Sequence, residues 1–166
     1  DIYARMAYID TMTGLGNRTA FLEENKSNAI FPGMISYIMM DANNLKTIND
    51  TLGHNKGDEL IITIAKCMRK AVGHNGQCYR IGGDEFVIIL KNKTAAETEE
   101  IINKVRCEIE FADKQSDITI SVAIGYVWTD TEQKNLEDLM QHADDEMYQD
   151  KKKTKENKSK ENTHSI

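Results

Sequence analysis

Two apolar runs separated by Gly-Gly-Asp-Glu constrain the fold of this chain more than any other feature. The first run covers Gln77 to Ile81 and the second covers Phe86 to Leu90. Short apolar runs joined by a glycine-containing turn are typical of a β-hairpin, in which we expect the glycines to supply positive backbone angles. The chain therefore contains a pair of antiparallel strands with Asp84 and Glu85 at the turn.

Two further segments have strand patterns. Met34 to Met40 is nearly continuous in apolar residues, begins after Pro32-Gly33 and stops at Asp41, which predicts a buried central strand. From Ile118 to Trp128, apolar residues alternate strictly with small or polar ones, which predicts a long strand with one buried face.

The remaining periodic segments predict helices. Residues 1–9 have the pattern of the end of a helix that arrives from upstream, and helical spacing recurs at about 18–28, 44–51, 56–72, 94–111 and 136–153. This order of elements predicts an α+β fold, with an antiparallel or mixed central sheet and helices on one side of it.

Length and composition indicate a single globular domain. The chain has 166 residues, of which 40% are hydrophobic and 29% are charged. It has no apolar run long enough to span a membrane and no signal segment, and it starts at Asp1, so we expect it to be part of a longer protein. We divide it into the end of an upstream helix or linker (1–9), a main domain (10–155) and a disordered lysine-rich tail (156–166).

The charge distribution restricts the class of ligand. Six lysines and two glutamates give residues 151–166 a charge of +4. Because the net charge of the whole chain is −6, residues 1–150 carry a charge of −10. An acidic body argues against nucleic-acid binding, but it is compatible with a small polyphosphate that metal ions and a few lysines meet locally. Three cysteines lack metal-ligand spacing, and we interpret them as free thiols in a reducing compartment.

Carboxylates are placed where a hard cation could bind. If the strand that ends at Asp41 lies beside the hairpin, then Asp41 and Asp84-Glu85 converge, and Mg²⁺ prefers one or two carboxylates plus phosphate oxygens. Glycines at the hairpin leave room for a triphosphate to approach. Taken alone, however, Gly-Gly-Asp-Glu is more often an ordinary solvated turn.

Five motifs in order decide between these interpretations. Arg80 to Phe86 resembles the signature of the GGDEF family of bacterial diguanylate cyclases. Four other segments resemble motifs of the same family. Residues 10–18 resemble Asp-x-Leu-Thr-Gly-Leu-x-Asn-Arg, and residues 41–50 resemble Asp-x-Asp-x-Phe-Lys-x-Ile-Asn-Asp. Residues 53–58 resemble Gly-His-x-x-Gly-Asp, and residues 143–151 resemble Ala-Asp-x-Ala-Leu-Tyr-x-Ala-Lys.

The resemblance implies a palm-like nucleotide-cyclase fold and an enzyme that joins two GTP molecules into cyclic di-GMP across a homodimer. It implies Mg²⁺ or Mn²⁺ held by Asp41, the Ala42 carbonyl and Asp84, with Glu85 beside them, and Asp84 or Glu85 as the group that assists deprotonation of the attacking hydroxyl. It also implies a cytoplasmic domain that makes no membrane contact itself and follows an upstream sensor, which in some full-length proteins is a membrane receptor.

The same resemblance assigns substrate contacts. Asn49 and Asp58 would bind guanine, because an ionised aspartate accepts hydrogen bonds from N1–H and the amino group of guanine and would repel the bare N1 of adenine. His54 would lie beside the nucleotide or only organise its loop. The remaining expected contacts, to the triphosphate, are those of Lys46, Lys151, Lys155, Gly82 and Gly83.

Some of these assignments have alternatives. Lys151 and Lys155 belong to a lysine-rich run that could simply be a solvated tail, and Arg80 could support the hairpin or touch a phosphate. Asn43 stands where the family often has a second aspartate, which removes a negative charge near the metal. The Arg-x-x-Asp of the product-inhibition site is replaced by residues 73–76, so we expect no feedback binding there.

Two other functions were weighed against the cyclase. A non-catalytic module that senses GTP or cyclic di-GMP would typically lack the metal carboxylates or the hairpin, which this chain keeps. A cyclase that makes a mixed cyclic dinucleotide is disfavoured, though not excluded, by Asp58.

Overall fold

The computed structural model describes residues 1–131 and 135–164. In this part of the chain the α-helices are α1 (Ile2–Tyr8), α2 (Arg18–Glu24), α3 (Leu45–Leu52), α4 (His54–Val72), α5 (Ala95–Gln115) and α6 (Leu136–Thr163). The strands are β1 (Ile35–Ala42), β2 (Gly76–Arg80), β3 (Glu85–Lys91) and β4 (Val122–Thr129). Short 3-10 helices cover Lys26–Ile30 and Gly73–Asn75.

The four strands form one sheet in the order β2-β3-β1-β4, and its three ladders are antiparallel. β1 is central, with Met39 opposite Val87 of β3 on one side and Gly125 of β4 on the other. The predicted hairpin and the predicted central strand are therefore confirmed, within two residues at each end.

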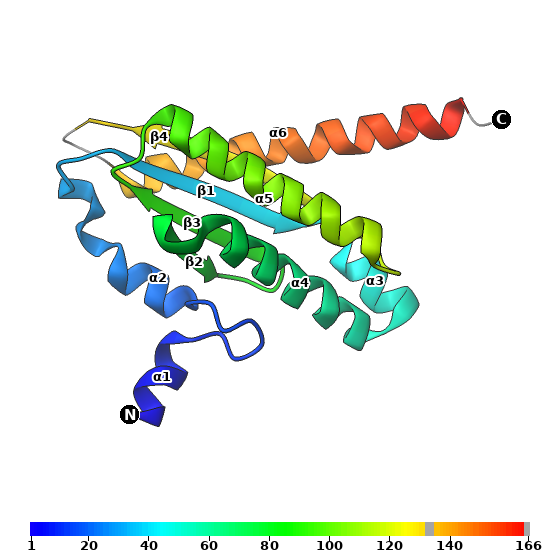
Figure 1. Ribbon diagram of the computed structural model, residues 1–166, viewed down its shortest axis with the longest axis horizontal. Helices are drawn as coiled ribbons and strands as arrows, with labels where there is room; N and C mark the ends of the chain where they lie inside the picture. Colours follow the sequence, from blue (N-terminus) through cyan, green and yellow to red (C-terminus); the bar gives the residue numbers. More distant parts are fainter. Residues whose placement is uncertain (132–134, 165–166) are drawn as a thin grey trace.

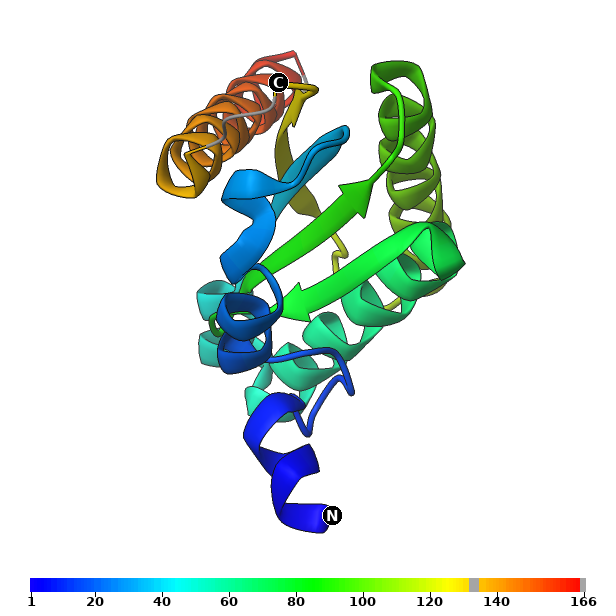
Figure 2. The ribbon, with the colours of Figure 1, turned by 90° about the vertical axis from the view of Figure 1, so that its left-hand side faces the viewer.

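Helices cover both faces of the sheet, so the prediction of helices on one side was wrong (Figures 1 and 2). Ile38 and Met40 belong to the core under α4 and α5, whereas Tyr37 and Met39 belong to a second core under α2 and α6. The reason is visible in β1, where the residues from Ile35 to Met40 are all buried. Because successive side chains of a strand point to opposite faces, a continuously apolar strand needs cover on both.

β4 begins at Val122, four residues later than the alternation from Ile118 predicted. Val122 pairs with Ala42, the last residue of β1, so the earlier residues have no β1 partner. Side chains replace the ladder there: Ile120 N donates to Asp113 Oδ1 at 2.8 Å and Ile118 N donates to Ser116 Oγ at 3.2 Å. Apolar alternation cannot distinguish these two ways of satisfying a backbone amide.

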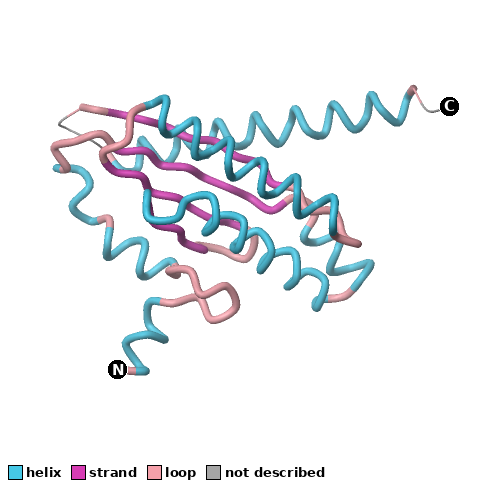
Figure 3. The backbone as a smooth tube through the Cα atoms, in the orientation of Figure 1, coloured by secondary structure: helices cyan, strands magenta, loops and turns pink. Residues whose placement is uncertain are grey.

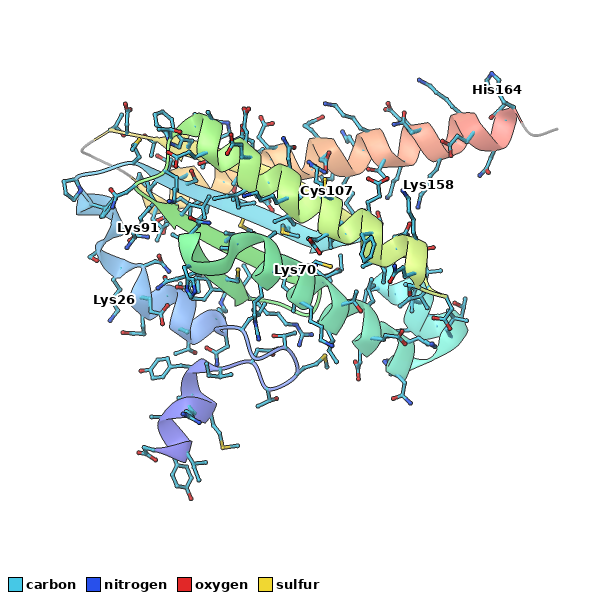
Figure 4. The ribbon with its side chains drawn as sticks, in the orientation of Figure 1. Lys26, Lys70, Lys91, Cys107, Lys158 and His164 are labelled. Atoms are coloured by element: carbon cyan, nitrogen blue, oxygen red, sulfur yellow. The ribbon has the colours of Figure 1, made fainter. Side chains whose placement is uncertain are left out.

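The tail expected to be disordered is instead the continuation of α6, which reaches Thr163 (Figure 1). Figure 4 shows Lys158 and His164 on the part of the helix that extends past the sheet. The residues after Thr154 are all exposed up to His164, so tertiary packing does not explain this last part of the helix. Lysine and glutamate favour helices, and no glycine or proline interrupts the run, so local propensity continues it.

Candidate active site

The site lies where β1 ends beside the start of β3 (Figure 3). Asp41 pairs with Glu85 in the ladder, and the backbone N–H of Ala42 donates to the Asp84 carbonyl at 2.8 Å. The antiparallel register thus brings the end of β1 beside the hairpin, with Asp84 close enough for its charge to act on Asp41. The sequence predicted that Asp41 and the hairpin would lie close together if their strands were neighbours, and β1 and β3 are neighbours.

Asp41 is the electrostatic centre of the site. Burial raises the pKa of its carboxyl group, a hydrogen bond from Lys151 opposes that rise, and the negative charge of Asp84 adds to it. Lys151 Nζ lies 2.8 Å from Asp41 Oδ2, whereas the buried Oδ1 has no hydrogen-bond partner among the described residues. One ammonium group therefore faces two carboxylates, and one buried acceptor is left over.

These groups fit a hard divalent cation. Asp41 and Asp84 supply two carboxylates, and the Ala42 carbonyl follows directly in the chain. No group of three or more His, Cys, Asp or Glu side chains converges anywhere in the described part of the chain. A two-carboxylate site matches Mg²⁺, which usually completes its shell with water and substrate phosphate oxygens.

The hairpin differs from the prediction in one respect. Neither Gly82 nor Gly83 has a positive φ, so their role is not to supply left-handed backbone. A Cβ at Gly82 would lie 3.0 Å from Glu85 Oε2, while a Cβ at Gly83 would meet no described atom within 4 Å. The Glu85 carboxylate thus folds beside Gly82, and the space over Gly83 is open toward an approaching ligand.

Arg80 links the hairpin to the connector before α2. Its Nη2 donates to the Gly83 carbonyl at 2.8 Å, and its Nη1 lies 3.2 Å from Asp10 Oδ1 in the connector before α2. Burial would raise the pKa of Asp10, but hydrogen bonds from Thr13 and the Arg80 guanidinium bring it below its ordinary value. These contacts favour hairpin support, and a phosphate contact by Arg80 stays a prediction.

The expected guanine contacts lie on two consecutive helices. Asn49 is half-buried on α3, whereas His54 and Asp58 are exposed in the first turns of α4. Gly57 is packed so closely on Asn49 that an added Cβ would overlap Asn49 Oδ1. This role of Gly57 was not foreseen from the sequence, and the nucleotide contacts of all three polar residues stay predictions.

Lysines of α6 line two cavities near the carboxylates, and one of these cavities is also lined by Asp144 and Asp145. Lys151 and Lys155 of α6 line a cavity of about 420 Å³ together with Asp41. The same two lysines and Lys158 line an adjoining cavity of about 240 Å³. The alternative of a solvated tail is excluded for Lys151, which is ion-paired with Asp41, while Lys46 lies exposed in the first turn of α3.

Asn43 stands where the family often has an aspartate near the metal, but its side chain contacts Ser121. Its side chain, in a residue only 7% exposed, donates from Nδ2 to Ser121 Oγ at 2.9 Å, and its backbone N–H donates to the Ser121 carbonyl at 2.8 Å. Asn43 therefore joins the end of β1 to the segment before β4. This tie was not foreseen, and no signal in the sequence pointed to Ser121.

The family described as "Diguanylate cyclase, GGDEF domain" matches residues 7–157. The chain belongs to the GGDEF family. The signalling protein YkoW of Bacillus subtilis is 34% identical over 91% of this chain, which spans 20% of YkoW. The diguanylate cyclase DgcN of Escherichia coli is 33% identical over 89% of this chain, which spans 38% of DgcN.

Solved GGDEF structures have the same fold. The GGDEF domain of DgcB from Caulobacter crescentus, solved with c-di-GMP, superposes with a TM-score of 0.79 at 25% identity, covering 88% of this chain and 91% of that one. The FimX GGDEF domain from Pseudomonas aeruginosa gives 0.77 at 19% identity over 88% of this chain and 94% of that one. The palm-like cyclase fold is therefore confirmed. Among the described residues, no helix is both long and apolar enough to cross a membrane.

Proposed function

We propose that this GGDEF domain is a diguanylate cyclase that condenses two GTP molecules into cyclic di-GMP and two pyrophosphates. The observation that carries the proposal is that Asp41 lies beside the hairpin, where it pairs with Glu85 and is close enough to Asp84 for that charge to raise its pKa. Lys151 Nζ is 2.8 Å from Asp41 Oδ2, and the space over Gly83 is open. Carboxylates for a cation, space for a triphosphate and a lysine for its charge are the parts that phosphoryl transfer requires. All of them lie near the end of β1.

In the proposed site, Asp41, the Ala42 carbonyl and Asp84 would hold Mg²⁺ or Mn²⁺. Such ions neutralise the triphosphate and lower the pKa of an attacking hydroxyl. The buried, unpartnered Oδ1 of Asp41 supports this assignment, because an uncompensated acceptor is costly unless a cation or donor meets it. Lys151 would then turn from Asp41 to the β- and γ-phosphates, together with Lys155 and Lys46.

The chemistry is a phosphoryl transfer performed twice. The 3′-hydroxyl oxygen of one GTP attacks the α-phosphorus of the other, and the bond from that phosphorus to the pyrophosphate oxygen breaks. The hydroxyl proton passes to Asp84 or Glu85, and the bonding electron pair leaves with pyrophosphate. The reciprocal step closes the ring.

Guanine selection would fall to Asn49 and Asp58. The carboxylate of Asp58 is an acceptor of hydrogen bonds and matches N1–H and the 2-amino group of guanine. The open environment of Asp58 leaves the carboxylate available. His54, at the start of the same helix, would lie beside the nucleotide.

The reaction needs two copies of the chain, since each site holds one GTP. We therefore expect a homodimer in the cytoplasm, as the output domain of a larger signalling protein with an upstream sensor. The chain spans well under half of YkoW and DgcN, so these features of the whole protein rest on the proposal alone.

Incubating the purified domain with GTP and Mg²⁺ or Mn²⁺, followed by chromatography of the nucleotides, tests the proposal. Cyclic di-GMP is expected, and its yield should rise with protein concentration. The same domain fused to a dimeric coiled coil is the control for weak self-association. If the fused dimer binds GTP but forms no cyclic di-GMP, the domain is a sensing module instead.

A further inference from the structure

α6 lies directly on β4, and small residues permit the contact. A Cβ on Gly125 would overlap the backbone nitrogen of Met147 and the carbonyl oxygen of Ala143. Ala143 and Met147 are the two buried residues of this helix. This close packing fixes the distance between α6 and β4. By itself it does not stop the helix from sliding or tilting along the strand.

A hydrogen bond one turn further along removes this freedom. Asp150 Oδ2 accepts the backbone N–H of Ile124 at 2.9 Å, on the edge of β4. The GGDEF motif that residues 143–151 resemble has alanine at position 150, and alanine cannot make this bond. Arg106 Nη1 of α5 lies 3.6 Å from the same carboxylate oxygen, but this arginine is half exposed. An ion pair of that kind contributes little, so the strand hydrogen bond is the stronger tie.

The tie lies next to the active site in both sequence and space. Ile124 follows Ala123, the β4 residue that pairs with Asp41, and Lys151 follows Asp150. Asp150 reaches the outer edge of β4 while Lys151 reaches over to Asp41 Oδ2 at 2.8 Å. A small shift of α6 along β4 would therefore carry the Lys151 ammonium away from the carboxylates.

We propose that Asp150 is a positioning residue, which fixes the register of α6 on β4 so that Lys151 reaches the phosphate-binding side of the site. The inference rests on the proposed function only in that Lys151 meets the triphosphate. The Asp150 carboxylate contacts Ile124 of β4 and Arg106 of α5. It acts through the backbone of β4.

A double-mutant cycle tests the coupling. The dissociation constant of 3′-deoxy-GTP, which lacks the attacking hydroxyl and cannot react, is measured by calorimetry with Mg²⁺ for the unaltered domain, Asp150→Ala, Lys151→Met and the double variant. Asp150→Ala should weaken binding by roughly fivefold to tenfold, as expected when a hydrogen bond that places a charged group is lost. In the Lys151→Met background it should have no further effect beyond about twofold.

Two more variants separate the hydrogen bond from other effects. Asp150→Asn keeps an oxygen that accepts from Ile124 N and should bind within about twofold of the unaltered domain. Glu156→Ala removes a charge from the exposed part of the same helix and should change nothing. Equal weakening by Asp150→Ala in both backgrounds, or an Asp150→Asn variant as weak as Asp150→Ala, would overturn the inference.

A second readout needs no nucleotide. The side-chain ¹⁵N signal of Lys151, identified by its loss in Lys151→Met, should move toward the position of solvated lysines in Asp150→Ala and stay in place in Glu156→Ala. An unmoved signal in Asp150→Ala overturns the inference by itself. If the unaltered domain fails to bind 3′-deoxy-GTP, the proposed function fails, and this signal still decides whether Asp150 positions Lys151.

Discussion

Lys151 Nζ lies 2.8 Å from Asp41 Oδ2, although 110 residues separate the two in the chain. The hydrogen bond that Lys151 donates to Asp41 raises the pKa of Lys151, a change that burial opposes and that the charge of Asp41 reinforces. The lysine therefore stays charged across the physiological range. Its ammonium group offsets part of the negative charge of Asp41 and Asp84.

Replacing this lysine should affect substrate binding more than turnover. We expect Lys151→Met to raise the KM for GTP by about tenfold or more, because the charge proposed to meet the phosphates is lost. Steady-state kinetics of pyrophosphate release measures it. Lys153→Met, on an exposed position of the same helix, is the matched control and should leave KM unchanged. Equal KM values for the two variants would contradict the assignment.

Removing the Asp84 charge should abolish product and stabilise the free protein. Asp84→Asn takes a like charge from beside Asp41, so the pKa of Asp41 falls toward its ordinary value. We expect cyclic di-GMP formation to drop at least about a hundredfold and the free energy of unfolding to rise by about 0.5–1 kcal/mol. Thermal melts without added metal and product assays check the two effects. A variant that still makes product would remove Asp84 from the catalytic groups.

Adding one methyl group at the hairpin should separate folding from binding. Gly83 does not have the positive φ that would disfavour alanine, and the space that its Cβ would occupy is open among the described residues. We expect Gly83→Ala to melt within about 2 °C of the unaltered domain. Its GTP affinity should nevertheless fall by at least about tenfold, since the methyl group occupies the space proposed for the triphosphate. Normal affinity would place the triphosphate elsewhere.

Gly57→Ala probes the base-binding side in the same way. The added Cβ overlaps Asn49 Oδ1, so the Asn49 side chain must move. We expect weaker GTP binding and a smaller preference for GTP over ATP, measured by competition titration. Ala65→Gly, a buried change further along α4, serves as the control for loss of stability without displacement of Asn49. If the two variants show the same nucleotide preference, Asn49 does not select the base.

The contact between Asp10 and Arg80 should appear in acid unfolding. Because the pKa of Asp10 is lower in the folded state, its carboxylate stabilises the fold above about pH 3.8, and that contribution disappears as the pH falls through the lowered pKa. Asp10→Asn should therefore cost about 1 kcal/mol at pH 6 and progressively less below pH 4. Urea titrations across this range measure it. A difference that does not change with pH would show that the charge of Asp10 is not involved.

Much of the fold could be predicted because its signals are local. The hairpin around Gly82 and the apolar run that ends at Asp41 define three of the four strands, and the helices follow from periodicity. The start of β4 could not be predicted, because Ile118 and Ile120 alternate like strand residues while side chains satisfy their backbone amides. The helical tail could not be predicted either, because low hydrophobicity is shared by disordered segments and by exposed helices.

The site residues could be predicted only where they belong to a family motif. The adjacency of Asp41 and Asp84 needed the strand order, which the motifs implied but local patterns did not. Contacts between segments far apart in the chain, such as Asn43 with Ser121, carry no local signal. Asp150 had a signal in its departure from the alanine of the motif, but only the structure shows its partner, Ile124.

The long separation of Asp41 and Lys151 has a consequence for synthesis on the ribosome. β1 is complete once residue 42 has emerged, yet its partner β4 spans residues 122–129 and Lys151 follows still later. Contacts between distant segments form late, because the chain between them must exist and close into a loop first. A nascent chain therefore displays the glycine hairpin long before it has the lysine, and the final helix turns a half-built binding surface into a competent one.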